Sequence, residues 1–118
     1  MRITQAFRFE AAHRLPGVPA THRCHRLHGH SYRVELTLEG PVDPVSGFVV
    51  DFFAVEAAFQ PLLARLDHWL LNEVEGLANP TAELIAIWIW ERARPALPQL
   101  IHVRVFETPD CWADYDGA

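Results

Sequence analysis

The chain has 118 residues, of which 50% are apolar and 21% are charged, and its formal net charge is −5. This length predicts one globular domain over residues 1–118, and the negative charge argues against a general role on nucleic acid or a membrane surface. All ten cationic residues are arginines, and the absence of lysine excludes Schiff-base lysine chemistry and a Walker-type phosphate loop.

The composition also bears on the compartment in which the protein works. No apolar run approaches the roughly 20 residues that are needed to span a bilayer. The N-terminal stretch MRITQAFRFEAAHRL alternates and contains a glutamate, unlike a signal peptide. We therefore expect a cytoplasmic protein, in which Cys24 and Cys111 are free thiols rather than a disulfide.

Cationic residues are concentrated between Ala11 and Val34, where four arginines and five histidines occur without a single acid. Such a basic stretch in an acidic protein indicates an anionic small ligand, for example a phosphate. The alternative is a solvated loop whose charges are balanced by acids from elsewhere in the fold.

Two strands are predicted from alternation of apolar and polar residues. In residues 2–13 the odd positions form an apolar face that leads to His13. Residues 28–39 alternate in the same way, and His28 and His30 begin the apolar, even-numbered face. If the two strands pair as a hairpin, its closed end brings His13 next to His28.

Helices are predicted where the apolar period changes to 3.6 residues. The first runs from Phe52 to about Asp67, with Asp51 as its N-cap, and Pro61 should kink or split it. The second begins near Thr81, after Asn79 and Pro80, and runs to Pro95.

The remaining connections complete the predicted fold class. Residues 40–47 predict a hairpin-type connection, followed by a short strand over residues 48–52. A last strand covers residues 100–107. Strands, helices and a further strand in this order indicate an α+β fold with an antiparallel sheet.

The histidines at the closed end of the hairpin predict a metal site. His28 and His30 are two residues apart on one strand, so both side chains leave the same face, and His13 has the matching position on the first strand. Three imidazoles with one open position are typical of a catalytic zinc ion. The alternative is three histidines hydrogen-bonded within a polar edge of the core.

Cys24 lies four residues before His28, and its role is open from spacing alone. It could be a fourth zinc ligand, which would give a closed structural site. It could instead act beside an open metal site as an acid or base, with its pKa lowered by cationic neighbours. A third reading is an inert small residue.

Two further groups could carry chemistry. Asp67 precedes His68 where the first helix ends, so the carboxylate could orient the imidazole. Spacing alone favours the alternative of a histidine that compensates the helix dipole. Glu107 ends the last strand on the parity of its apolar residues and therefore needs a partner. That partner could be a ligand with two adjacent N–H donors or an arginine.

Taken together, six motifs resemble the 6-pyruvoyl-tetrahydropterin synthase family. They occur in the family's order over nearly the whole chain: FEAAHRL (9–15), CHRLHGH (24–30), DF (51–52), LDH (66–68), NPTAE (79–83) and FET (106–108). The three residues between Cys24 and the His-Gly-His motif resemble the 6-carboxytetrahydropterin-forming branch, because pyruvoyl-forming members typically have a longer gap.

The resemblance implies a tunnelling fold (T-fold), in which a four-stranded antiparallel sheet carries two helices on one face. Three subunits would form a twelve-stranded barrel, and two such trimers would stack as a homohexamer. A closed barrel would remove the exposed sheet edges of so small a subunit. The active sites would lie between subunits.

The resemblance also implies an activity and its residues. The enzyme would be a zinc-dependent lyase that converts 7,8-dihydroneopterin triphosphate to 6-carboxy-5,6,7,8-tetrahydropterin, acetaldehyde and triphosphate in queuosine and 7-deazaguanine biosynthesis. The zinc ligands would be His13, His28 and His30. Glu107 would anchor the pterin, supported by Thr81 and Thr108, and Cys24 with the pair Asp67 and His68 would transfer protons.

Two other functions remain open at this level. The same fold could carry a pyruvoyl-forming synthase or a related pterin side-chain lyase. A non-catalytic assembly protein, stabilised by zinc with Cys24 as the fourth ligand, is the alternative from another class. Two positions depart from the family pattern, since His25 and Ala82 stand where relatives often have a small residue and a serine.

Overall fold

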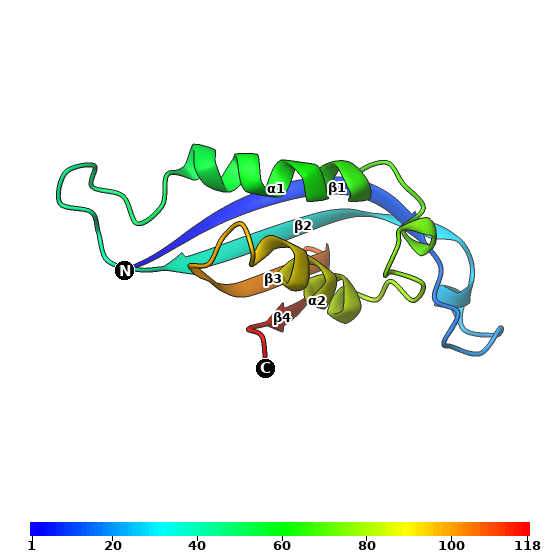
Figure 1. The fold of residues 1–118 in the computed structure, drawn as a ribbon. Coiled ribbons are helices and arrows are strands. Elements are labelled where there is room, and N and C mark those ends of the chain that lie inside the picture. The colour runs from blue at the N-terminus through cyan, green and yellow to red at the C-terminus, as the bar shows by residue number, and fades with distance from the viewer.

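The long hairpin of β1 (Arg2–His13) and β2 (His28–Glu39) forms half of a four-stranded antiparallel sheet in the order β1-β2-β3-β4. The computed structural model, which describes residues 1–118, adds β3 (Leu100–Thr108) and β4 (Cys111–Tyr115) on the other side of β2. The helices α1 (Phe52–Leu66) and α2 (Ala82–Ala93) lie on the sheet, α1 along β1 and α2 along β3 and β4 (Figure 1). This arrangement confirms the predicted fold class.

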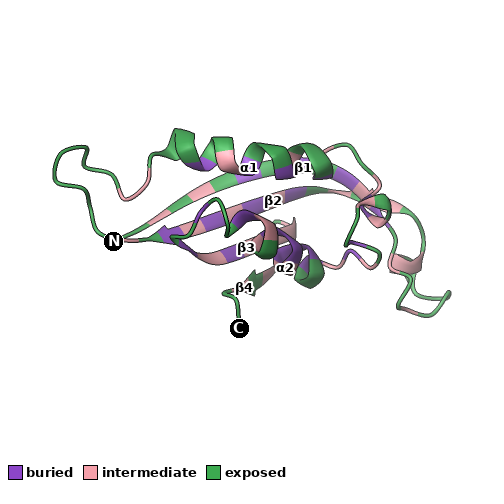
Figure 2. Ribbon diagram, viewed as in Figure 1, coloured by how far each residue is buried: buried purple, intermediate pink, exposed green.

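One face of the sheet forms the core together with the buried sides of the helices. The alternating residues that point toward the helices are buried along the strands (Figure 2). They are Phe7, Phe9, Ala11, Tyr32, Val34, Leu36, Leu38, Val103 and Val105. The other face carries polar side chains, of which Arg2 and Glu39 form a cross-strand ion pair. The two-residue period of the sequence therefore separates the two faces.

The prediction of a short strand over residues 48–52 is wrong. These residues form a bend that leads into α1, because the Asp51 carboxylate accepts the Phe53 N–H at 2.9 Å and caps the helix instead of joining a ladder. The fourth strand is β4, which follows a turn at Pro109 and Asp110. It was missed because it is only 5 residues long and mostly polar or exposed.

Both predicted helix starts are confirmed by their caps. Thr81 caps α2 through its hydroxyl, which accepts the Leu84 N–H at 3.1 Å. Pro61 does not split α1, which continues through it to Leu66. Proline is tolerated here on an exposed position, although it removes one backbone donor from the helix. Neither helix has the length and apolar character that crossing a membrane requires.

The outer edge of β1 is covered only at its C-terminal end. There the His68 N–H donates to the Glu10 carbonyl at 2.6 Å, and the Ala12 N–H donates to the Trp69 carbonyl at 3.1 Å. The segment after α1 thus continues the sheet for a few residues, with a bridge between Ala12 and Leu70. The rest of that edge, and the outer edge of β4, have no neighbouring strand within the chain.

Replacing Pro61 with alanine is expected to stabilise the protein. The substitution restores a backbone donor inside α1 and improves helix propensity, which corresponds to about 1–3 kcal/mol. The midpoint of denaturant unfolding, at matched protein concentration, measures the gain. Gln60→Ala, at an exposed neighbouring position of the same helix, is the control and should change stability little. An unchanged or lower midpoint for Pro61→Ala would contradict the expectation.

Candidate metal centre

Three imidazoles converge at the end of the β1–β2 hairpin. His13 is the register partner of His28, and His30 follows on the same face of β2. The ring centroids of the three are separated by 4.6, 4.9 and 5.0 Å. One nitrogen from each ring lies within 4.8 Å of the others, close enough for the three to hold one metal ion. The convergence predicted from strand parity is therefore observed.

Backbone carbonyls determine which ring nitrogens face the cluster. The His13 Nδ1–H donates to the Pro80 carbonyl at 2.8 Å, and the His28 Nδ1–H donates to the Arg26 carbonyl at 2.7 Å. A carbonyl can only accept, so both Nδ1 atoms carry the proton. The two Nε2 atoms, 2.9 Å apart, are then both acceptors in neutral rings.

Two facing lone pairs at this distance repel unless a cation lies between them. His30 adds a third such atom, since its Nε2 is buried and has no hydrogen-bond partner. A divalent cation bound by neutral imidazoles would satisfy all three nitrogens. The arrangement therefore fits a metal ion, and zinc suits a three-histidine set with an open position.

Burial favours the neutral, metal-binding form of two of these imidazoles, His13 and His30. His13 is the one buried polar residue of the core, at 0% exposure. Desolvation lowers its pKa, against the opposing effects of the Pro80 carbonyl and Glu107. Desolvation likewise lowers the pKa of His30, again opposed by Glu107. Neutral rings at physiological pH need not release protons before they bind a cation.

Glu107 lies beside the histidines. Its Oε1 is 3.3 Å from the His30 Nε2, although the two atoms are not aligned as a hydrogen bond. No arginine of the same chain is within ion-pair distance of Glu107, so a single chain does not support the alternative of an arginine partner. The carboxylate also borders an open cavity of about 400 Å³ between the start of α2 and β4.

Cys24 does not join the cluster of nitrogen atoms. It is half-buried in a 3-10 turn (Arg23–His25), where its N–H donates to His22 Nδ1 and its carbonyl accepts the Leu15 N–H. No sulfur atom is close enough to the three imidazoles to count among the possible ligands. The structure therefore does not support Cys24 as a fourth ligand of a closed site.

Asp67 and His68 lie together at the end of α1. The Asp67 Oδ1 is 3.0 Å from His68 Nδ1 and also accepts the Glu10 N–H at 2.9 Å. This backbone hydrogen bond is the main reason that the pKa of Asp67 is lowered. His68 has φ 63°, a left-handed conformation that is strained for any residue with a side chain.

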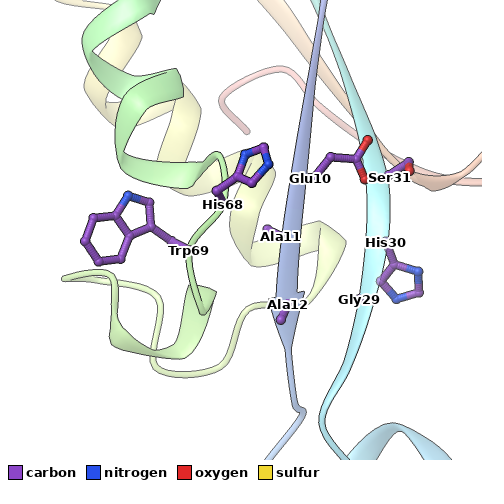
Figure 3. Close-up of a pocket in the computed structure, with 8 residues that line it drawn as sticks. All are labelled: Glu10, Ala11, Ala12, Gly29, His30, Ser31, His68 and Trp69. Carbon is purple, nitrogen blue, oxygen red and sulfur yellow. Dashed lines mark hydrogen bonds between the residues drawn. The ribbon is translucent and has the colours of Figure 1, made fainter.

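His68 lies outside the metal cluster. Its side chain is 78% exposed, and it borders an open cavity of about 450 Å³ beside β1 and β2. In Figure 3 His68 lies beside β1 and His30 lies on the far side of β2, although both residues border this cavity. A single chain thus does not bring the His68 imidazole to the three nitrogens.

The two threonines have structural partners. The hydroxyl of Thr81 is engaged as the cap of α2. The hydroxyl of Thr108 accepts the Asp110 N–H at 3.3 Å in the turn after β3. Thr108 directly follows Glu107 on the strand, but the two residues border different cavities. The cavity at Thr108 is also lined by Arg8, Arg33 and Phe106. The structure therefore does not gather all the predicted substrate contacts at one place.

Pro80, Arg26 and Tyr32 contribute to the site without having been predicted. The first two act through backbone carbonyls, for which side-chain patterns contain no signal. The Tyr32 hydroxyl lies 3.2 Å from His13 Nδ1 on a side chain that is buried and stacked against Phe9. Its place next to His30 on the same strand face was visible, but its alternation with apolar residues made it read as core.

Comparisons with known proteins agree with this architecture. Residues 2–118 match the family described as 6-pyruvoyl tetrahydropterin synthase. A 6-carboxy-5,6,7,8-tetrahydropterin synthase of Synechocystis sp. is 40% identical over 96% of this chain and 91% of its own length. A 6-pyruvoyl tetrahydrobiopterin synthase of Drosophila melanogaster is 33% identical over 98% of this chain and 79% of its own length.

A solved structure of the Caenorhabditis elegans 6-pyruvoyl tetrahydropterin synthase superimposes with a TM-score of 0.92. The alignment covers 100% of this chain and 96% of that one, at 28% identity.

Replacing His68 with glycine is expected to stabilise the fold. Glycine adopts φ 63° without strain, and the gain corresponds to about 1 kcal/mol. Thermal unfolding at matched protein concentration measures it. His22→Gly, at φ −74°, is the control and should lose stability, because that backbone conformation suits any residue and the variant also removes the acceptor of the Cys24 N–H. If both glycine variants lose stability equally, the conformation of His68 is not strained.

Proposed function

The chain belongs to the 6-pyruvoyl tetrahydropterin synthase family, and from this premise we propose that it is a zinc-dependent lyase acting on 7,8-dihydroneopterin triphosphate. The proposed products are 6-carboxy-5,6,7,8-tetrahydropterin, acetaldehyde and triphosphate, which would serve queuosine and 7-deazaguanine synthesis. The similarity to the Synechocystis enzyme and the short gap between Cys24 and the His-Gly-His motif support the carboxy product.

The observation that carries the proposal is the set of three unsatisfied imidazole nitrogens. His13, His28 and His30 would hold the zinc ion, and Cys24 leaves the fourth position free. A bound zinc ion would polarise the oxygens of the substrate side chain and stabilise negative charge that develops on them. An open position is what separates such a site from a closed structural one.

The chain's own residues would bind the substrate and move protons. The Glu107 carboxylate would accept two adjacent N–H groups of the pterin, with Thr81 and Thr108 as supporting contacts. Cys24 and His68 would transfer protons at carbon atoms of the side chain. The Asp67 carboxylate, 3.0 Å from His68 Nδ1, would keep that nitrogen protonated and direct Nε2 at the substrate.

The position of His68 supports a site shared between subunits. Its ring is exposed on the side of β1 away from the cluster, so the histidine that serves a given zinc ion would come from another copy. The uncovered edges of β1 and β4 are suited to pairing between copies. We therefore expect the trimeric barrel and the homohexamer implied by the resemblance.

Two other functions are distinguished by simple measurements. A pyruvoyl-forming synthase, as in the Caenorhabditis elegans relative, would release triphosphate without cleaving a carbon–carbon bond. A non-catalytic protein stabilised by zinc would lose its metal and its assembly on Cys24→Ala. The place of Cys24 outside the nitrogen cluster argues against that second alternative.

Incubation with 7,8-dihydroneopterin triphosphate tests the proposed reaction. Mass spectrometry is expected to find the 6-carboxy product together with acetaldehyde. Removal of zinc by a chelator should abolish turnover, and zinc addition should restore it, because the metal stabilises the charge that forms on the substrate oxygens. A pyruvoyl product without acetaldehyde would contradict the proposed reaction and would indicate the related pyruvoyl-forming synthase.

Mixed assemblies test whether the site is shared. Cys24→Ala and His68→Ala subunits are each expected to bind zinc but to be inactive alone. If each site takes Cys24 from one chain and His68 from another, random co-assembly leaves about a quarter of the sites intact and restores that share of activity. Mixing each variant with itself is the control. No recovery in zinc-loaded mixed assemblies would contradict a shared site.

A further inference from the structure

Glu107 lies beside the metal cluster and also borders the cavity between α2 and β4. Its Oε1 lies 3.3 Å from His30 Nε2, and that nitrogen has no hydrogen-bond partner. The charge of Glu107 also reaches His13 and Tyr32. No other acid is so close to any of the three imidazoles.

We propose that Glu107 couples the two ligands of the site, because its carboxylate stabilises the bound zinc ion from outside the coordination shell and is withdrawn from it when a pterin ring binds. The inference rests on the proposed function for the identity of the ring, whereas its effect on zinc rests on the position of Glu107 alone. It gives this residue a second role besides anchoring the substrate.

The Glu107 carboxylate is expected to strengthen zinc binding. Three neutral imidazoles leave both positive charges of a zinc ion uncompensated, in a place where His13 is fully buried. A carboxylate next to one of the ligands offsets part of that charge in a region of low dielectric. Glu107 is not among the groups whose atoms converge as possible ligands, so its effect would come from its charge. Outer-shell groups that hydrogen-bond a ligand change metal affinity about 10- to 100-fold, and we take the lower end of that range, about 10-fold, for a carboxylate that acts through its charge.

Binding of the ring should change this balance. Two N–H donors on the carboxylate draw its negative charge away from the metal, which then attracts the oxygens of the substrate side chain more strongly. A pterin without such a side chain has no side-chain oxygens that could bind the metal and offset the loss of the carboxylate's stabilisation. It should therefore weaken zinc binding, and zinc should weaken its binding by the same factor.

A simpler reading of the 3.3 Å contact predicts the opposite sign. If Glu107 only pairs with a protonated His30 in the metal-free protein, it stabilises that state and opposes zinc binding. Removing the carboxylate would then leave zinc affinity unchanged or raise it. The direction of the change thus separates the two readings.

The test is the zinc affinity of the full-length, metal-stripped assembly, measured by competition with a chromogenic chelator. Glu107→Gln keeps the shape of the side chain and is expected to weaken zinc binding about 10-fold. Glu107→Asp keeps the charge and should lose less. Glu83→Gln is the matched control, since Glu83 borders the same cavity without contacting a histidine, and it should stay within about two-fold of the wild type.

The second arm repeats the titration with unsubstituted pterin. The wild type should lose zinc affinity several-fold, and Glu107→Gln should not respond. Zinc affinity of Glu107→Gln equal to or above that of the wild type, in protein with unchanged assembly, would overturn the coupling. Because neither arm measures turnover, failure of the proposed reaction would leave the zinc arm intact, and failure of the coupling would leave the product assay intact.

Discussion

The antiparallel register of β1 and β2 is the constraint on which the site depends. It sets His13 opposite His28 and leaves His30 on the same face, with Ala11 as its partner. A shift of one residue would turn every side chain of a strand to the other face. The same shift would remove Phe9 and Tyr32 from the core. Core packing and the convergence of the imidazoles therefore depend on the same alternation of side chains along the two strands. A register shift that removed the metal ligands would also expose the buried apolar residues.

Backbone carbonyls orient the imidazole rings that the register brings together. The carbonyls of Pro80 and Arg26 hold the Nδ1–H groups of His13 and His28, so the Nε2 atoms face each other. Pro80 immediately precedes the Thr81 cap, and the docking of α2 on β3 and β4 thus determines the orientation of a ring on β1. A metal-binding geometry that is set by buried backbone acceptors varies little, because the alternatives would leave those acceptors without donors.

The other half of the proposed machinery is arranged differently. Asp67 and His68 lie on the outer edge of β1, where hydrogen bonds to Glu10 hold the chain in a strained turn. Strain of this kind persists where the surrounding structure fixes the residue, and it is common at functional sites. Here it holds an exposed imidazole outside the metal cluster of its own chain. The arrangement makes sense if the neighbouring edge belongs to another copy.

Local patterns in the sequence were sufficient for much of this protein. Alternation predicted β1 and β2, the change of period predicted α1 and α2, and Asp51 and Thr81 marked their starts. The grouping of three histidines followed from parity together with the expected hairpin pairing of the two strands. These features depend on neighbours along the chain, and their physical basis is the geometry of a single helix or strand.

Contacts between distant segments were decided only by the tertiary structure. The short β4 exists because β3 offers it an edge, whereas residues 48–52 find no partner and bend into α1. The partners of the His13 and His28 rings are backbone carbonyls, which every residue has and no side-chain pattern distinguishes. The left-handed turn at His68 and the contact of Glu107 with His30 likewise arise from packing across the sheet. A sequence specifies which groups are present, but the distances between remote ones follow from how the elements dock.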